Sequence, residues 1–259
     1  RDTSVTGVQT CALPISLMIQ PQSLPSATAV PLLISTLLAA ATGAFAESTN
    51  IAEPALGPSF NSHYMDPDVE RWRRVFESPG REIFDQRQVI VQATGVRPGM
   101  AVADIGTGTG LFAILFARAV GPAGKVYAVD ISPGFVEAIE QRAADYRLAN
   151  LTPVVNDPKQ TGLPPGSVDL VFLCDTYHHF EYPGAMLDSI SNALRQGGEL
   201  VVIDFRREPG VSSPWVMSHV RANQAEVVAE IEAAGFELVE TPDFLRENYF
   251  LRFRKLREG

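Results

Sequence analysis

An apolar strand that runs directly into a glycine-rich turn is the feature of this sequence that most constrains its fold. Residues 102–110 read VADIGTGTG, and an apolar stretch with helical spacing, 111–120, follows at once. Glycines in such a turn let the backbone approach a ligand because they carry no Cβ. The free N–H groups at the start of the helix favour an anionic group such as a carboxylate. The sequence therefore predicts a strand, a ligand-binding turn and a helix, in that order.

The chain after this turn alternates short apolar runs with helical patterns, which is typical of a parallel sheet covered on both faces. Strands are expected at 100–105, 125–130, 151–155, 168–174 and 199–205. Helices are expected at 66–76, 81–93, 111–120, 133–147, 182–194 and 220–234.

Two more β-like runs, 236–240 and 248–254, end the chain with no helix between them, so we expect them to pair as a terminal antiparallel hairpin. The predicted fold class is α/β: a doubly wound, mostly parallel seven-stranded sheet with N-terminal helices and a terminal antiparallel hairpin.

The glycine-rich turn resembles the first motif of the class I S-adenosylmethionine-dependent methyltransferases, because Asp104 is followed by Gly106, Gly108 and Gly110. The resemblance spans about residues 70 to 255 and includes a Gly-Gly pair at 197–198 before the fifth strand. It implies S-adenosylmethionine as the cofactor, held by its methionine part in this loop with Asp104 near the ammonium group. The alternative is a dinucleotide-binding turn, since residues 108–113 also fit G-x-G-x-x-A.

Two acids after later strands add to the predicted cofactor site. Asp130 ends the second strand, where a carboxylate can accept hydrogen bonds from both ribose hydroxyls, although it could also cap the next helix. The resemblance implies that Ile131 packs on the adenine and that Asp157, after the third strand, accepts a hydrogen bond from the adenine amino group. Asp157 could instead be a solvated turn residue.

The fourth strand ends in CDTYHHF, residues 174–180, an unusual density of polar and aromatic groups at an edge where open α/β sheets bind ligands. Methyl transfer from a sulfonium needs alignment, plus a base if the acceptor must lose a proton. Asp175, His178 and His179 are the predicted catalytic residues; alternatively, one histidine caps a helix and the other packs. No metal site is expected, because adjacent histidines on a helix point about 100° apart and no third ligand has a convincing spacing.

Two segments could cover this site. Residues 204–221 follow the fifth strand and carry Arg206, Trp215 and His219, so they could cap an acceptor pocket or merely form a solvated loop. His63 and Tyr64, just before the first expected helix, could form a lid over the cofactor.

The first 46 residues are expected to lie outside the folded domain. Residues 5–15, VTGVQTCALPI, look like the translated end of a sequencing-library adapter and are excluded from fold reasoning. The apolar run at 30–46 ends in Ala-Phe-Ala, the form a signal peptidase accepts, so we expect cleavage before Glu47 and a periplasmic or secreted product. If the leader does not function, the protein is cytoplasmic. The expected division is 1–46 leader, 47–98 lead and lid helices, and 99–259 the cofactor-binding domain.

The charge balance narrows the class of partner. The formal net charge is −9, with 30 acidic against 21 basic residues, which disfavours a nucleic-acid backbone or an anionic membrane surface. No Asn-Pro-Pro-Tyr-like motif follows the fourth strand, so nothing indicates methylation of nucleic acid bases. The sequence predicts methyl transfer to a small molecule, with no nucleic-acid partner and no stable membrane insertion after leader cleavage. The alternatives are an exported, non-catalytic ligand-binding protein on the same fold and an NAD-dependent oxidoreductase.

Overall fold

The computed structural model of the chain describes residues 53–57 and 59–256. The strands are β1 (Ala101–Ile105), β2 (Lys125–Asp130), β3 (Leu151–Val155), β4 (Val168–Cys174), β5 (Leu194–Phe205), β6 (Phe236–Glu240) and β7 (Asn248–Lys255). The helices are α1 (Ser62–Met65), α2 (Val69–Phe76), α3 (Glu82–Asp85), α4 (Arg87–Ala93), α5 (Leu111–Val120), α6 (Pro133–Asp145), α7 (Pro183–Ala193), α8 (Pro214–His219) and α9 (Gln224–Ala233), with a 3-10 turn η1 (Tyr177–His179).

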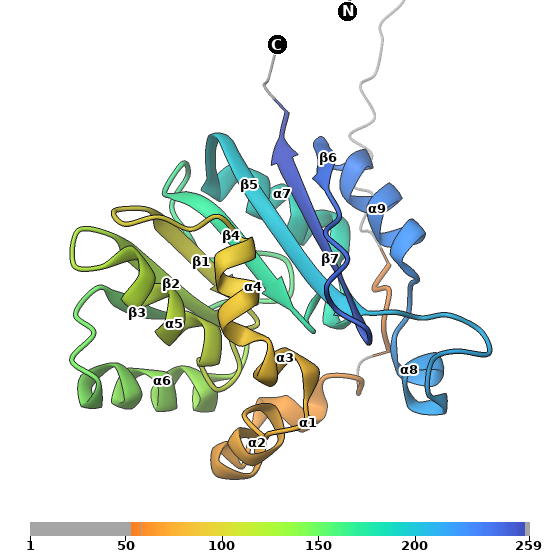
Figure 1. Cartoon of the computed structure of the whole chain (residues 1–259), viewed down its shortest axis with the longest axis horizontal. Coiled ribbons are helices and arrows are strands. Elements are labelled where there is room, and N and C mark those ends of the chain that lie inside the picture. Colours follow the sequence, from red (N-terminus) through yellow and green to blue (C-terminus); the bar gives the residue numbers. More distant parts are fainter. Residues whose placement is uncertain (1–52, 58, 257–259) are drawn as a thin grey trace, which may run out of the picture. The chain divides into compact units, whose positions relative to one another are not determined.

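The strands form one seven-stranded sheet in the order β3-β2-β1-β4-β5-β7-β6 (Figure 1). Strands β1 to β5 are parallel, whereas β7 lies between β5 and β6 and is antiparallel to both. The predicted fold class and the antiparallel pairing of the last two strands are confirmed. The strand order reverses at β1, which has β2 on one side and β4 on the other, so a crevice is expected beyond the carboxyl ends of these strands.

Each face of the sheet buries its own apolar layer. One layer contains apolar side chains of α4, α5 and α6 packed on β1, β2 and β4, among them Ile90, Phe116 and Ile139. The other contains side chains of α7 and α9, including Ile190 and Ile231. Figure 1 shows α4 and α5 in front of the sheet and α7 behind it. Because both faces are covered, the central strands read as continuous apolar runs rather than alternating ones.

Several expected boundaries of helices and strands were wrong. The helix expected at 220–234 begins at Gln224, because Asn223 and Glu226 form a capping box that starts it there. The helix expected at 81–93 is two short helices that meet at Gln86. Strand β5 starts at Leu194 rather than at 199, and its pairing with β4 contains a register shift between Val168 and Leu170.

Helix α8 was not expected, although its signals are present in the sequence. Ser213 accepts a hydrogen bond from the backbone N–H of Val216, and Pro214 occupies the first helical position. Together with α1 and α2, α8 lies beyond the carboxyl ends of the parallel strands (Figure 1). These three short helices are the parts of the fold that cover the crevice.

The predicted leader falls outside the described residues: both the adapter-like run at 5–15 and the apolar run at 30–46 belong to the part of the chain that the structure does not describe. Among residues 53–57 and 59–256, none of the helices has the length and apolar character needed to span a bilayer.

Candidate functional site

A cavity of about 720 Å³ opens at the carboxyl ends of β1, β2 and β4. Its floor is the glycine-rich turn with Asp104 and Asp130, and its walls include Tyr64, Trp72 and Trp215 from the covering helices. The volume lies within the range of about 300 to 1,000 Å³ typical of small-molecule sites. The cavity is therefore large enough for a nucleoside-sized cofactor and part of a second molecule.

The glycine-rich turn is held in a shape that other residues would strain. Gly106, Gly108 and Gly110 all have positive φ, at 69°, 55° and 82°. A Cβ on Gly106 would lie 2.2 Å from Cγ2 of Thr176, so glycine is required there on steric grounds as well. The backbone N–H of Gly106 donates to the carbonyl of Val129 (2.8 Å), which ties the turn to β2. Gly106 and Gly108 line the cavity, whereas Gly110 is not among its lining residues and lies against Ile139.

Asp104 lies at the cavity floor near the end of β1 and is 3% exposed. Its Oδ2 accepts a hydrogen bond from the hydroxyl of Thr107 at 2.7 Å. Burial raises the pKa of this carboxyl to about 7, and the neighbouring Asp130 adds to the rise. A buried carboxylate with one hydroxyl partner is suited to a cationic ligand group, which would compensate its burial.

Asp130 ends β2 and also faces the cavity. Its Oδ2 accepts from the backbone N–H of Gly108 (2.8 Å) and its Oδ1 from that of Ser132 (2.9 Å). Burial raises its pKa to about 6, while these backbone donors favour the ionised form. Each carboxylate oxygen keeps a second lone pair, so the side chain can shape the turn and still accept from a ribose hydroxyl. Asp130 does not cap the helix that follows it, because the N-cap of α6 is Ser132.

The two predicted adenine contacts are both placed at the cavity wall. Ile131 and Asp157 line it, together with Asn156. Asp157 is exposed, and its Oδ1 accepts from the backbone N–H groups of Lys159 (2.7 Å) and Gln160 (2.9 Å), which makes it a turn residue as well. The role of both residues toward an adenine ring stays a prediction.

Asp175 lines the cavity, but both of its oxygens already have partners. Arg81 donates to Oδ2 at 2.5 Å and Asn248 donates to Oδ1 at 2.6 Å. Burial raises the pKa of Asp175 to about 6 even though Arg81 opposes the rise. Its backbone has positive φ (50°), unusual for a residue with a Cβ. In this geometry Asp175 connects Arg81, on the covering segment, to β7, and the catalytic role given to it stays a prediction.

His178 is buried and faces Asp204 at the end of β5. Its Nδ1 is 2.7 Å from Oδ1 of Asp204, and its backbone N–H donates to Oδ2 at 3.0 Å. Burial alone would lower the pKa of His178, but the Asp204 carboxylate raises it above the usual value. The side chain is 3% exposed and lies behind the residues that line the cavity.

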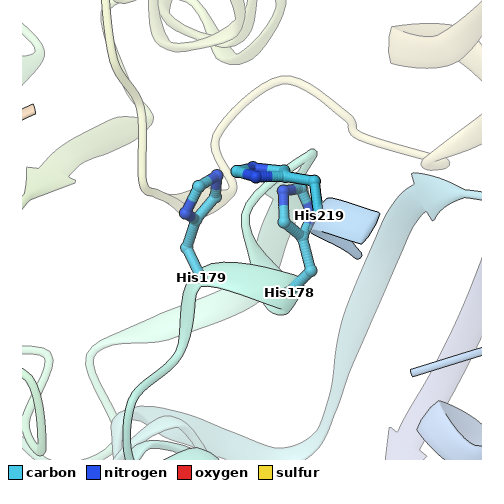
Figure 2. A group of neighbouring side chains, drawn as sticks. All are labelled: His178, His179 and His219. Carbon is cyan, nitrogen blue, oxygen red and sulfur yellow. The ribbon is translucent and has the colours of Figure 1, made fainter. Parts of the chain in front are cut away.

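His179 does line the cavity, and it meets His219 of α8 there. Its Nδ1 is 2.9 Å from Oδ1 of Asn61. Burial lowers the pKa of His179 to about 2, and His178 and His219 lower it further. Figure 2 shows the three imidazoles turned toward one another, with His178 and His179 on η1 and His219 on α8.

The segment ahead of β1 is fastened over the cavity by charged side chains that sequence reasoning missed. Glu77 accepts from Nη1 of Arg142 (2.6 Å) on α6 and from the hydroxyl of Thr109 (2.9 Å) in the glycine-rich turn. Glu82 accepts from the backbone N–H groups of residues 246–248, where the preceding loop enters β7. No sequence signal marks these residues, because their partners are far away along the chain. Tyr64, expected in a lid, does line the cavity and packs edge-on against His179.

Different residues of the segment after β5, 204–221, have different contacts. Trp215 and His219 line the cavity and stack on each other with ring centroids 4.6 Å apart. Arg206 instead pairs with Asp243 at 2.8 Å and is part of the loop structure. The segment thus caps the cavity through α8, while this arginine points elsewhere.

Comparison with known proteins finds methyltransferases. Residues 102–198 match a family described as "Methyltransferase domain". The ubiquinone/menaquinone biosynthesis C-methyltransferase UbiE of Bordetella parapertussis is 31% identical over 149 residues, which are 56% of this chain and 57% of that protein. The same enzyme of Pseudomonas putida is 30% identical over 122 residues, 47% of this chain and 48% of that protein. The chain thus spans about half the length of the curated relatives it matches.

Solved structures share the fold. A SAM-dependent methyltransferase from Aquifex aeolicus has a TM-score of 0.65 at 24% identity, and the match covers 74% of this chain and all of that one. An S-adenosylmethionine-dependent methyltransferase from Mesorhizobium loti has a TM-score of 0.54 at 16% identity, covering 68% of this chain and 99% of that one. These likenesses show that residues 102–198 match a methyltransferase domain and that the chain has the fold of S-adenosylmethionine-dependent methyltransferases.

Proposed function

We propose that this protein transfers the methyl group of S-adenosylmethionine to a small molecule that enters the same cavity. The observation that carries the proposal is the arrangement of Asp104, the glycine-rich turn and Asp130 on one cavity floor. The anionic floor and the close backbone approach fit a ligand with an ammonium group and a ribose. When bound, this cofactor supplies a methyl group activated by a positively charged sulfur.

The residues of the chain would bind the cofactor and align it with the acceptor. Asp104 would hold the ammonium group, the turn the carboxylate, and Asp130 the ribose hydroxyls. The lid residues would exclude water from the reacting centre, since Glu77 ties α2 to the glycine-rich turn itself. Alignment of acceptor and methyl group in this enclosed space is the main requirement of such a displacement.

The aromatic side of the cavity indicates the class of acceptor. Tyr64, Trp72, Phe205 and Trp215 all line it, so a flat and largely apolar molecule fits better than a charged one. The curated relatives methylate carbon in quinone biosynthesis, according to their names. We therefore propose a hydroxylated aromatic or quinol-like acceptor for this chain.

The test has two arms. S-adenosylhomocysteine and NAD are titrated into the protein by calorimetry, and transfer of a labelled methyl group is then followed with a panel of hydroxylated aromatic compounds and quinols. Tight binding of S-adenosylhomocysteine with label transfer to at least one compound is the expected result. Binding without transfer to any of them favours the non-catalytic ligand-binding protein, and a preference for NAD favours the oxidoreductase.

We also propose that the mature protein begins at Glu47 and is exported. The support is the apolar run at 30–46, which ends in Ala-Phe-Ala. The chain from Met18 is expressed in a Gram-negative host with and without residues 18–46, with lysines added before the apolar run to supply the positive region of a signal peptide. A periplasmic product that starts at Glu47 is expected; a full-length product confined to the cytoplasm contradicts the proposal.

A further inference from the structure

Three of the four histidines of this chain meet beside the cavity, with His179 and His219 in its wall and His178 behind them. His178 and His179 are adjacent on η1, and His219 arrives from α8, so that one ring nitrogen of each lies within 4.8 Å of the other two. The sequence predicts no metal site because no third ligand has a convincing spacing, but the fold brings His219 to this position as a third imidazole. Figure 2 shows the rings facing a common point.

The hydrogen bonds around the cluster leave one nitrogen of each ring available. Nδ1 of His178 is engaged by Asp204 and Nδ1 of His179 by the side-chain oxygen of Asn61. When the Nδ1 atoms donate these bonds, each Nε2 carries a free lone pair. Histidines that bind metals are held in this way, with the second ring nitrogen donating to a carboxylate or carbonyl oxygen.

The unpartnered ring nitrogen of His219 is a second, independent observation that points to a ligand. Its Nε2 is buried and has no hydrogen-bond partner among the residues that the structure describes. The ring is fixed by stacking on Phe60, with centroids 4.7 Å apart, and on Trp215, at 4.6 Å. A buried polar atom without a partner is costly, so a ring held in this position calls for a ligand.

We propose that His178, His179 and His219 form a binding site for a divalent first-row transition metal ion, with zinc as the best match. Three neutral imidazoles are a ligand set that zinc accepts, with Zn–N distances of about 2.0 to 2.1 Å that place tetrahedral ligand atoms about 3.4 Å apart. The ring nitrogens lie within 4.8 Å of one another, so metal binding requires the side chains to move closer together.

Such a site keeps a coordination position open. Three protein ligands leave at least one position for water or for an oxygen of a bound molecule. His179 and His219 line the cavity, so an ion among the three rings lies at its wall and can be reached from inside. The site does not depend on the proposed methyl transfer, and its test needs no turnover.

The test measures metal binding by the protein without a polyhistidine tag. Zinc is titrated by calorimetry, and cobalt(II) is titrated as a spectroscopic probe whose visible absorption bands report nitrogen ligands. We expect one equivalent of each metal to bind with a micromolar Kd or tighter. His219→Gln weakens binding at least about 100-fold, and Asn61→Ala weakens it about tenfold by releasing the His179 ring.

His63→Gln is the matched control. It removes the fourth histidine of the chain, which is exposed and bonds Oγ of Ser62, and leaves the cluster intact. Binding that this variant retains and His219→Gln loses supports the site. If folded His219→Gln and wild type bind zinc equally, or if wild type binds neither metal, the proposal is wrong. His179→Gln replaces His219→Gln if the latter loses its helical circular dichroism.

Discussion

The carboxyl of Asp104 should make the stability of the protein depend on pH in a direction opposite to that of an ordinary ion-paired aspartate. Burial raises its pKa from 3.8 to about 7 in the folded chain. Between these values the folded chain holds a proton that the unfolded chain has released. The free energy of unfolding therefore falls as the pH rises through this window, and the contribution is lost fully only above about pH 7.

The size of the effect follows from the pKa. At 1.36 kcal/mol for each pKa unit, ionising this buried carboxyl costs about 4 kcal/mol by pH 8. Asp104→Asn keeps the shape and can still accept the hydrogen bond from Thr107, but it cannot ionise. We expect the variant and wild type to be nearly equal in stability at pH 4, and the variant to be more stable by an amount that grows to roughly this figure at pH 8.

The assay is urea unfolding followed by circular dichroism at pH 4, 5, 6, 7 and 8 for both proteins, without added ligand. The difference between the two curves isolates Asp104, because other titrating groups such as Asp130 contribute to both. A difference that does not change with pH refutes the assignment of a raised pKa to Asp104. In wild type the affinity for S-adenosylhomocysteine should also rise up to about pH 7, because its ammonium group binds the ionised form; Asp104→Asn should lose both the affinity and its pH dependence.

Four further outcomes test the site. Asp130→Ala should weaken S-adenosylhomocysteine binding at least about tenfold in calorimetry, because a charge-assisted pair is lost; unchanged affinity in a folded variant removes the assignment. Gly106→Ala should destabilise the fold by about 2 kcal/mol or more in urea, since it adds strain at positive φ and a clash with Thr176; Thr176→Ala in the same chain should restore part of the loss, and no restoration means that the clash is not the cause. Glu77→Ala should cost about 2 kcal/mol, because it leaves Arg142 half-buried without its partner; hydrogen exchange in α2 should speed up, and an unchanged rate there contradicts the lid contact. His179→Ala should lower turnover with little change in cofactor affinity, because the ring lines the cavity where the acceptor is proposed to bind; joint loss of stability and cofactor binding would make this histidine structural.

The sequence alone predicts the sheet and the cofactor floor because both depend on local patterns. The apolar runs of β1 to β4 match the expected strands within one residue, since strands buried on both faces need continuous apolar residues. Asp104 and Asp130 could be placed because each stands at the carboxyl end of a strand, and parallel topology brings those ends to one edge. The boundaries that were predicted wrongly include one set by capping, the start of α9 at Gln224 after its N-cap Asn223.

Only the tertiary structure decides what surrounds that floor, because the partners there are far apart along the chain. Asn61 reaches His179 over 118 residues, Arg81 reaches Asp175 over 94, and His178 faces Asp204 over 26. No periodicity or motif encodes such pairs, since they exist only when the N-terminal segment folds over the sheet edge. The same packing places His219 beside the two histidines of η1. The sequence thus determines the fold and the glycine-rich turn, whereas long-range packing decides which side chains face the rest of the cavity.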